Sequence, residues 1–402
     1  MESVNNVCNI KVVGVGGGGN NAVNRMIAAG VSGVYFVAVN TDKQDLMMSN
    51  ADQIIQIGKT LTKGLGAGSN SEVGKAAAEE SEEEIKKMLQ GTDLLFITAG
   101  LGGGTGNGAA PVIARYAHEM GILTVGVVTK PFRFEGPKRA SNAESGMEEL
   151  QKYVDSLVII PNDKLYTMFK KDVSMVDAFR YADDVLRQAI QGVSDVISVA
   201  GSINLDFADV ATIMRHKGIA HMGIGRGRGA NKTIEAVRQA VTSQLLETSI
   251  EGATGILINI AGGEDLTISE VYEAADLVRD VADPNCNVIF GANFNNTTPG
   301  EAVVTIIATG FDKKKTEEDK QIPEFKDNSA SFKTFSQPEQ FAQPEQPIQP
   351  EQNEEAETEQ QEEEINEQQP EHSEEVEDIS VNAGNQEIDE DDIPPFLRKL
   401  RK

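Results

Sequence analysis

Short apolar runs rich in β-branched residues recur along the first three quarters of the chain and constrain its fold more than any other feature. Helix-like stretches separate them, a pattern typical of buried parallel strands joined by crossover helices. We therefore predict an α/β fold with a Rossmann-like parallel sheet, a long central helix and a second, smaller α/β domain. The main runs are NIKVVGV, VYFVAVN, DLLFITA, ILTVGVVT, DSLVIIP, GILINI and NVIFGA.

This pattern stops after Phe311, and a polar, acidic segment follows. Residues 1–312 carry 26 Lys and Arg against 37 Asp and Glu, whereas residues 313–402 carry 10 against 26. Three QPEQ repeats lead into residues 351–378, which hold thirteen Glu and one Asp but no Lys or Arg. Such a segment cannot bury enough apolar surface to offset its ordering entropy, so we expect a disordered acidic spacer.

The composition also excludes several classes of protein. The only two cysteines, Cys8 and Cys286, are too few and too far apart in the sequence for a disulfide framework, so we expect two reduced thiols. No apolar run reaches 18 residues and no signal peptide is evident, which predicts a cytoplasmic protein that meets the membrane only through a partner. The net charge of −27 argues against nucleic-acid binding.

Two glycine-rich segments each follow a predicted strand and precede a predicted helix. In the first, Gly14, Gly16 and Gly19 match the dinucleotide fingerprint, and Asp42 follows the next strand, so an NAD-dependent oxidoreductase is one alternative. The second segment, GLGGGTGNGAA, repeats the same arrangement after a later strand. Two anion-binding loops at one sheet edge fit a triphosphate better than a pyrophosphate.

Two other glycine motifs are less informative. The GKT sequence at Gly58 has Gln53 where a P-loop requires glycine, and no other stretch fits that pattern. The cluster at residues 63–74 is predicted to be either a mobile cover over the nucleotide or a plain surface turn.

Seven motifs follow one another along roughly residues 9–312: GVGGGGNNAVNRM, AVNTD, GLGAG, GGGTGNGAAPVIA, VVTKPFRFEGPKR, IIPND and NLDFADV. In their order and spacing, the chain resembles FtsZ, the family of bacterial tubulin-like cell-division GTPases. The terminal DIPPFLRKL is also similar to the C-terminal peptide of that family. The resemblance implies GTP and GDP as the nucleotides, with Mg²⁺.

The resemblance assigns the nucleotide-binding residues. Phe179 and Asp183 match the positions that stack on guanine and accept from its N1–H and 2-amino groups, a donor pair that adenine lacks. Asn107 and Ser71 depart from the usual Thr or Ser and Pro, and we expect binding to survive both changes. The other assigned residues are Gly17, Gly18, Gly19, Asn20 and Asn21 in the first loop, Gly104, Thr105 and Gly106 in the signature loop, and Glu135 and Arg139 at the ribose and phosphates.

Asp206 and Asp209 stand three residues apart at the start of a predicted helix. One carboxylate could simply cap that helix. Alternatively, the pair could position a water molecule and a cation for phosphoanhydride hydrolysis, with Asn204 in support. The helical stretch from about Ser174 to Val199 would carry these residues ~35–40 Å from the nucleotide, out of reach of the chain's own GTP.

In the FtsZ family, head-to-tail stacking solves this problem, because the corresponding loop of one subunit completes the site of the next. Such a contact does not close and therefore builds a filament. The resemblance thus implies a polymerising GTPase that forms the ring at midcell under the inner membrane. A scaffold that polymerises without hydrolysis is the second alternative.

The region after the central helix offers little further chemistry. His216 and His221 lack a carboxylate or Cys at a recognisable ligand spacing, so we predict no metal site there. The stretch GIGRGRGAN is interpreted as a flexible basic turn on the surface.

The chain closes with apolar residues after the acidic spacer, where a core cannot be their purpose. We expect a short amphipathic helix that forms on binding, and the resemblance implies docking to membrane-linked adaptors such as FtsA. The residues concerned are Ile393, Pro394, Pro395, Phe396, Leu397 and Leu400. The predicted division is a GTP-binding domain at 1–175, a central helix at 176–200, a GTPase-activating domain at 201–312, the linker at 313–387 and the adaptor-binding peptide at 388–402.

Overall fold

The structure is a computed structural model that divides into two units, Met1–Lys326 and Asp327–Lys402. All described residues belong to the first unit. The predicted acidic linker and the adaptor-binding peptide with Ile393 to Leu400 therefore lie outside the described residues, as does Asn204. The described ranges are 8–168, 173–198, 206–243, 250, 252–263, 265–293 and 300–311.

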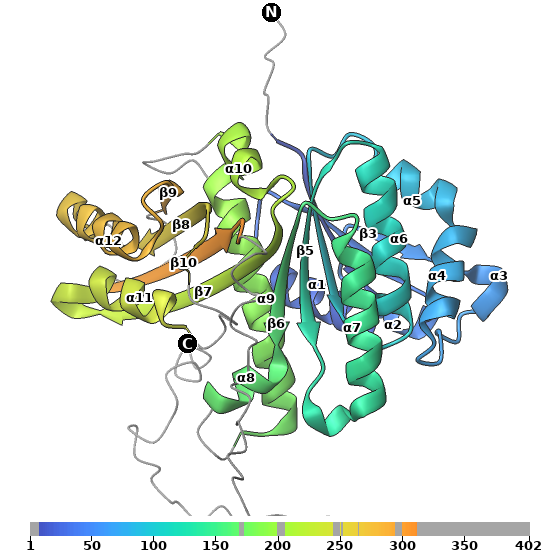
Figure 1. Ribbon diagram of the computed structural model, residues 1–402. Coiled ribbons are helices and arrows are strands. Elements are labelled where there is room, and N and C mark those ends of the chain that lie inside the picture. The colour runs from blue at the N-terminus through green and yellow to red at the C-terminus, as the bar shows by residue number, and fades with distance from the viewer. Residues whose placement is uncertain are drawn as a thin grey trace, which may run out of the picture. The chain divides into compact units, whose positions relative to one another are not determined.

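Six parallel strands form the first part of the sheet, in the order β3-β2-β1-β4-β5-β6 (Figure 1). The chain winds outward in one direction from β1 and then restarts in the other direction from β4, so the strand order reverses between these two strands. In open α/β sheets, ligands bind beyond the carboxyl ends of the strands at such a point. The strands are β1 Ile10–Val15, β2 Tyr35–Asn40, β3 Gln53–Gln56, β4 Leu94–Gly100, β5 Leu123–Lys130 and β6 Ser156–Pro161.

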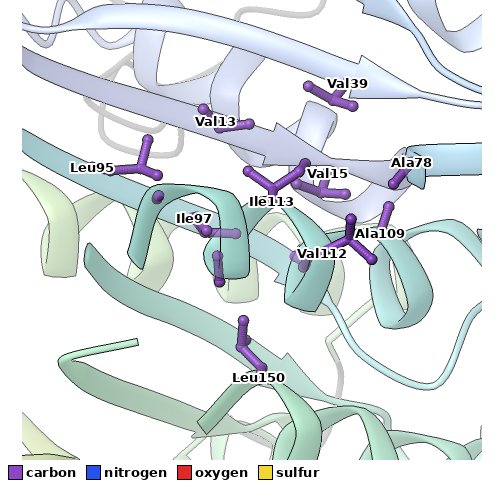
Figure 2. Packing of buried hydrophobic residues seen from close by; sticks show 14 of the residues in the cluster. Val13, Val15, Val39, Ala78, Leu95, Ile97, Ala109, Val112, Ile113 and Leu150 are labelled. Carbon is purple, nitrogen blue, oxygen red and sulfur yellow. The ribbon is translucent and has the colours of Figure 1, made fainter. Parts of the chain in front are cut away.

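Helices cover both faces of these strands, as their nearly continuous burial requires. On one face, α1 and α9 pack against alternate residues such as Val12 and Phe96. On the other, Val13 and Val15 of β1 and Ile97 of β4 face Ile113 of α6 (Figure 2). The helices of this part are α1 Gly16–Ala28, α2 Lys43–Met47, α3 Lys59–Thr62, α4 Ser71–Glu80, α5 Glu82–Leu89, α6 Thr105–Glu119, α7 Pro137–Gln151, α8 Asn162–Met168 and α9 Met175–Ser198, with a 3₁₀ turn η1 at Arg133–Glu135.

Helix α9 is the long helix that the sequence predicts, 24 residues from Met175 to Ser198. Its apolar residues recur at helical spacing and are buried against both parts of the sheet. They are Ala182, Val185, Leu186, Ala189, Ile190, Val193 and Val196.

The remaining strands continue the sheet in the order β6-β7-β10-β8-β9. β7 runs parallel to β6, β10 runs antiparallel to both β7 and β8, and β9 is parallel to β8. Helices α11 and α12 pack on one face of these strands, and α9 and α10 pack on the other. The elements are α10 Phe207–Met214, β7 Gly218–Arg228, α11 Lys232–Val241, β8 Gly255–Gly262, α12 Ile268–Val281, β9 Asn287–Asn293 and β10 Glu301–Thr309.

The prediction of a flexible basic turn at GIGRGRGAN is wrong, because residues 223–228 continue strand β7. Gly223, Gly225 and Gly227 alternate along the strand on the side that faces α11. A Cβ at each would overlap a backbone carbonyl oxygen of that helix. These glycines thus allow α11 to pack directly on the strand, and only the 3₁₀ turn after Arg228 is a turn.

The described residues contain neither a membrane-spanning helix nor a metal-binding cluster. None of the helices there is both long and apolar enough to cross a bilayer. No group of three or more His, Cys, Asp or Glu side chains in the same residues is arranged to hold a metal ion.

Candidate nucleotide-binding site

Helix α1 begins inside the first glycine run. Gly16 opens it with a φ of +72°, and a Cβ there would lie 2.8 Å from the backbone nitrogen of Gly106 in α6. The first four N–H groups of a helix have no partner within it, so those of Gly17 and Gly18 remain available. The start of α1 therefore offers donors and the positive end of a helix dipole to an anion.

Helix α6 provides a second start of the same kind beside the first. Gly102, with a φ of +93°, turns the chain after β4, and Gly104 precedes the first helical residue, Thr105. The hydroxyl oxygen of Thr105 lies 2.6 Å from that of the buried Thr41, which follows β2. This hydrogen bond fixes the first turn of α6 against the end of a neighbouring strand.

Glu135 and Arg139 lie on either side of the junction between η1 and α7 and form an ion pair. The Glu135 carboxylate also accepts a hydrogen bond from the backbone N–H of Phe132 at 2.9 Å. Arg139 can therefore supply a charged donor to a phosphate, and Glu135 can supply an acceptor to a sugar hydroxyl.

Phe179 and Asp183 lie one turn apart on α9. The ring of Phe179 meets that of Phe132 edge to face, with centroids 5.3 Å apart, and remains 39% exposed. Burial raises the pKa of Asp183 to about 6, against a lowering by the nearby Arg25 guanidinium. An open ring and a half-desolvated carboxylate at this spacing suit a planar base that carries hydrogen-bond donors.

These elements surround a cavity of about 1190 Å³ at the carboxyl ends of β1, β2, β4 and β5. It lies where the reversal of strand order predicts a ligand site. The structure brings ten of the twelve predicted nucleotide-binding residues together in its lining. They are Gly17, Gly18, Asn21, Gly104, Thr105, Gly106, Glu135, Arg139, Phe179 and Asp183.

Gly19 and Asn20 do not line the cavity. A Cβ at Gly19 would overlap the carbonyl oxygen of Thr98, so this glycine serves the close packing of α1 on the sheet. Asn20 is 3% exposed, and neither polar atom of its side chain has a partner. Successive helical residues point about 100° apart, so the side chains of residues 17 to 21 are distributed over several sides of α1.

Several cavity residues lie outside the predicted set. Arg25 follows Asn21 by one turn on the same face of α1. Asn162, which opens α8, is buried in the wall with no partner for its side-chain oxygen. The loop of residues 63–70 also contributes to the wall, through Leu65, Gly66, Gly68 and Ser69. Two features of the sequence could have indicated these residues. One is the helical spacing of Asn21 and Arg25, and the other is the polar residue Asn162 directly after β6.

Asp206 and Asp209 lie far from this cavity, at the start of α10, which Figure 1 shows at the opposite end of α9 from α8. Both side chains are exposed. Asp206 occupies the N-cap position, but its side chain makes no capping hydrogen bond, so the capping explanation finds no support. The 24 residues of α9 span roughly 36 Å at 1.5 Å per residue.

Paired helix N-termini at a reversal point of a doubly wound sheet, with a ring and a carboxylate at one side, define a nucleotide-binding α/β protein. Comparison with known proteins is more specific. Residues 9–170 match the GTPase domain of the Tubulin/FtsZ family, and residues 218–312 match the C-terminal domain of the FtsZ family.

Solved structures agree with these matches. An FtsZ dimer from M. jannaschii is 46% identical, with a TM-score of 0.73 over 75% of this chain and 88% of that one. CetZ1 from Haloferax volcanii, bound to GDP, is 23% identical, with a TM-score of 0.66 over 76% and 95%. CetZ2 from the same organism, a protofilament bound to GTPγS, is 24% identical, with a TM-score of 0.64 over 77% and 96%.

The chain belongs to the FtsZ family of tubulin-like GTPases. The predicted α/β fold and the family resemblance are confirmed, and the NAD-dependent oxidoreductase is not supported. The two CetZ structures, at their lower identity, agree in fold alone.

Proposed function

We propose that this protein hydrolyses GTP within head-to-tail filaments of its own copies, and that these filaments form the cytokinetic ring at the bacterial division site. One observation carries the proposal. The candidate catalytic carboxylates, Asp206 and Asp209, and the nucleotide cavity lie at opposite ends of α9. A single chain cannot bring them together, whereas a second chain stacked end to end can.

Exposed apolar side chains around the cavity support such stacking. Leu65 is 83% exposed at the cavity wall, Met48 is 77% exposed just after α2, and Val176 is 60% exposed at the start of α9. Leu65 and Val176 both line the cavity, and exposed apolar side chains that gather at one place often mark an interaction site. The occupant we propose is a second copy of this chain, in keeping with the FtsZ dimer among similar structures.

Within the site, each group has a physical role. Phe179 stacks on guanine while the ionised Asp183 accepts from its N1–H and 2-amino groups. The first turns of α1 and α6 and the Arg139 guanidinium hold the phosphates. The neighbouring subunit's Asp206 and Asp209 orient the attacking water, and Asn204 assists them.

Mg²⁺ fits this chemistry. It is held by substrate phosphates with one or two carboxylates rather than by a protein cage, and Asp45 is a cavity carboxylate beside Gly17. The ion would neutralise charge on the phosphates. Loss of the terminal phosphate would then weaken the subunit contact that enabled hydrolysis.

The cellular part of the proposal rests on the family membership. We place the protein in the cytoplasm, assembled at midcell under the inner membrane, where its C-terminal peptide binds membrane-linked adaptors such as FtsA and the ring recruits other division proteins. Binding of a synthetic peptide of residues 388–402 to such an adaptor tests this part of the proposal.

The experiment that tests the enzymatic part measures phosphate release with GTP and Mg²⁺ across a series of protein concentrations, with light scattering in parallel. We expect turnover per subunit to be near zero below a threshold and to rise with scattering above it. Constant turnover from the lowest concentration would contradict a shared site.

Asp209→Ala separates the enzyme from a scaffold that polymerises without hydrolysis. We expect the variant to assemble with GTP while its turnover falls at least tenfold, because the water loses its orienting group. Asp209→Asn tests whether charge is required. Unchanged turnover in an assembling Asp209→Ala polymer would remove this residue from the mechanism.

A further inference from the structure

Asn107, one of the two departures from the usual family pattern, joins three segments of the protein through its side chain. It is 4% exposed. Its Oδ1 accepts a hydrogen bond from the backbone N–H of Gly102 at 3.1 Å. Its Nδ2 donates to Ser71 Oγ at 3.0 Å and to the carbonyl oxygen of Asn142 at 2.9 Å. Both donors of the amide and one of its two acceptor positions are thus used.

The backbone around Asn107 is shaped to hold this side chain. A Cβ at Gly146 of α7 would overlap the Asn107 amide group. A Cβ at Gly108 would overlap the carbonyl oxygen of Ser71, and one at Gly74 would overlap that of Gly104. The starts of α4 and α6 therefore pack backbone to backbone, and the amide links that pair to α7.

Each of the three partners continues directly into the phosphate end of the cavity. Ser71 follows the loop whose Gly68 and Ser69 line the cavity. Gly102 belongs to the signature loop itself. Asn142 lies one turn after Arg139, which also lines the cavity. No bond of Asn107 reaches α9, which carries the residues proposed for the base.

We propose that Asn107 is a positioning residue for the terminal phosphate of the nucleotide. By fixing the 63–70 loop, the signature loop and the first turns of α7 in one arrangement, it lets all three contact that phosphate together. Ser71, its partner at the start of α4, directly follows the 63–70 loop, so the two departures from the family pattern act as a pair. This inference rests on the proposed guanine-nucleotide site.

The test compares affinities for GDP and for the slowly hydrolysed GTPγS, measured below the assembly threshold. We expect Asn107→Ala to weaken GTPγS binding about tenfold and GDP binding less than about threefold, since loss of buried hydrogen bonds at one end of the site is of this order. Ser71→Ala should weaken GTPγS binding about threefold, and Ser71→Thr, which keeps the hydroxyl, should restore it.

Thr124→Val is the matched control, because it removes a buried hydroxyl that bonds to the carbonyl of Ile122, away from the cavity. It should change neither affinity. If Asn107→Ala does not fold, the Ser71→Ala and Ser71→Thr pair decides. Equal loss for both nucleotides, or no difference within that pair, would overturn the inference. Failure of the unaltered protein to bind guanine nucleotides would instead contradict the proposed function.

Discussion

The Nε atom of Arg25 lies 3.7 Å from the Asp183 carboxylate, across the gap between α1 and α9. The two groups are too far apart for a direct hydrogen bond, and Arg25 Nε is buried without another partner. The guanidinium nevertheless lowers the Asp183 pKa, which burial raises to about 6. Arg25 therefore helps to keep ionised the carboxylate that we propose reads the guanine base.

We first predict that Arg25→Ala makes GDP binding more sensitive to acid. Without the guanidinium, the pKa of Asp183 rises further above about 6, and a protonated carboxyl loses acceptor capacity toward guanine. As the pH decreases, the affinity of the variant should begin to fall at a higher pH than that of the unaltered protein. Binding of GDP between pH 5 and pH 8 measures this, and parallel pH profiles would contradict it.

We next predict that Asp183→Asn stabilises the protein without nucleotide while abolishing its preference for guanine. Because the folded-state pKa is raised, the carboxyl contributes stability below its ordinary 3.8, and this contribution is lost as the pH rises through about 6. At pH 7 the ionised group costs up to about 3 kcal/mol. Urea unfolding at pH 7 and pH 4 should show a gain of about 1–3 kcal/mol at pH 7 only.

The sequence predicts the fold well where strands are apolar and continuous. Strands β1, β2, β4, β5, β6, β8 and β9 all coincide with the apolar runs. β3 is only four residues long with Gln at both ends, and β7 carries alternating glycines, so neither has the apolar signal of a buried strand. In β7 the glycines, which have no side chains, form the surface on which α11 packs. A pattern of apolar residues therefore does not reveal this strand.

The sequence motifs identify the segments that form the candidate site. They identify less well which residues of α1 line the cavity. A motif is a run of consecutive residues, whereas a helix turns successive residues to different sides. Gly19 and Asn20 are therefore absent from the cavity lining, while Arg25, a turn after Asn21, is part of it. Asn162 was within a recognised motif, yet its burial with an unpartnered oxygen is visible only in three dimensions.

The third prediction compares two glycines, one in each glycine run: one that close packing requires and one that has open space around it. Gly19→Ala should destabilise the protein by roughly 2–3 kcal/mol, because its Cβ would overlap the carbonyl oxygen of Thr98. Gly103→Ala is the control, since a Cβ at that position has no heavy atom within 4 Å. Thermal unfolding without nucleotide compares the two. A similar melting temperature for both variants would show that α1 can shift without cost.

The last prediction concerns the joint between the two parts of the sheet, where Asp155 is 4% exposed. One carboxylate oxygen accepts from the backbone N–H of Thr124 at 2.9 Å. The other lies 3.1 Å from His216 Nδ1 and accepts from the His216 backbone N–H at 3.2 Å. Asp155 thus fastens β5 to the segment between α10 and β7.

Asp155→Ala should therefore cost about 2–4 kcal/mol of unfolding free energy, because it leaves the buried N–H of Thr124 and the partly buried N–H of His216 without a partner. His216→Ala should cost under about 1 kcal/mol, because the His216 side chain is 70% exposed and its backbone N–H is retained. Since α10 carries the candidate catalytic carboxylates, Asp155→Ala should also lower turnover in the polymer more than it lowers GDP affinity. Equal effects of the two substitutions on stability would show that Asp155 does not fasten this joint.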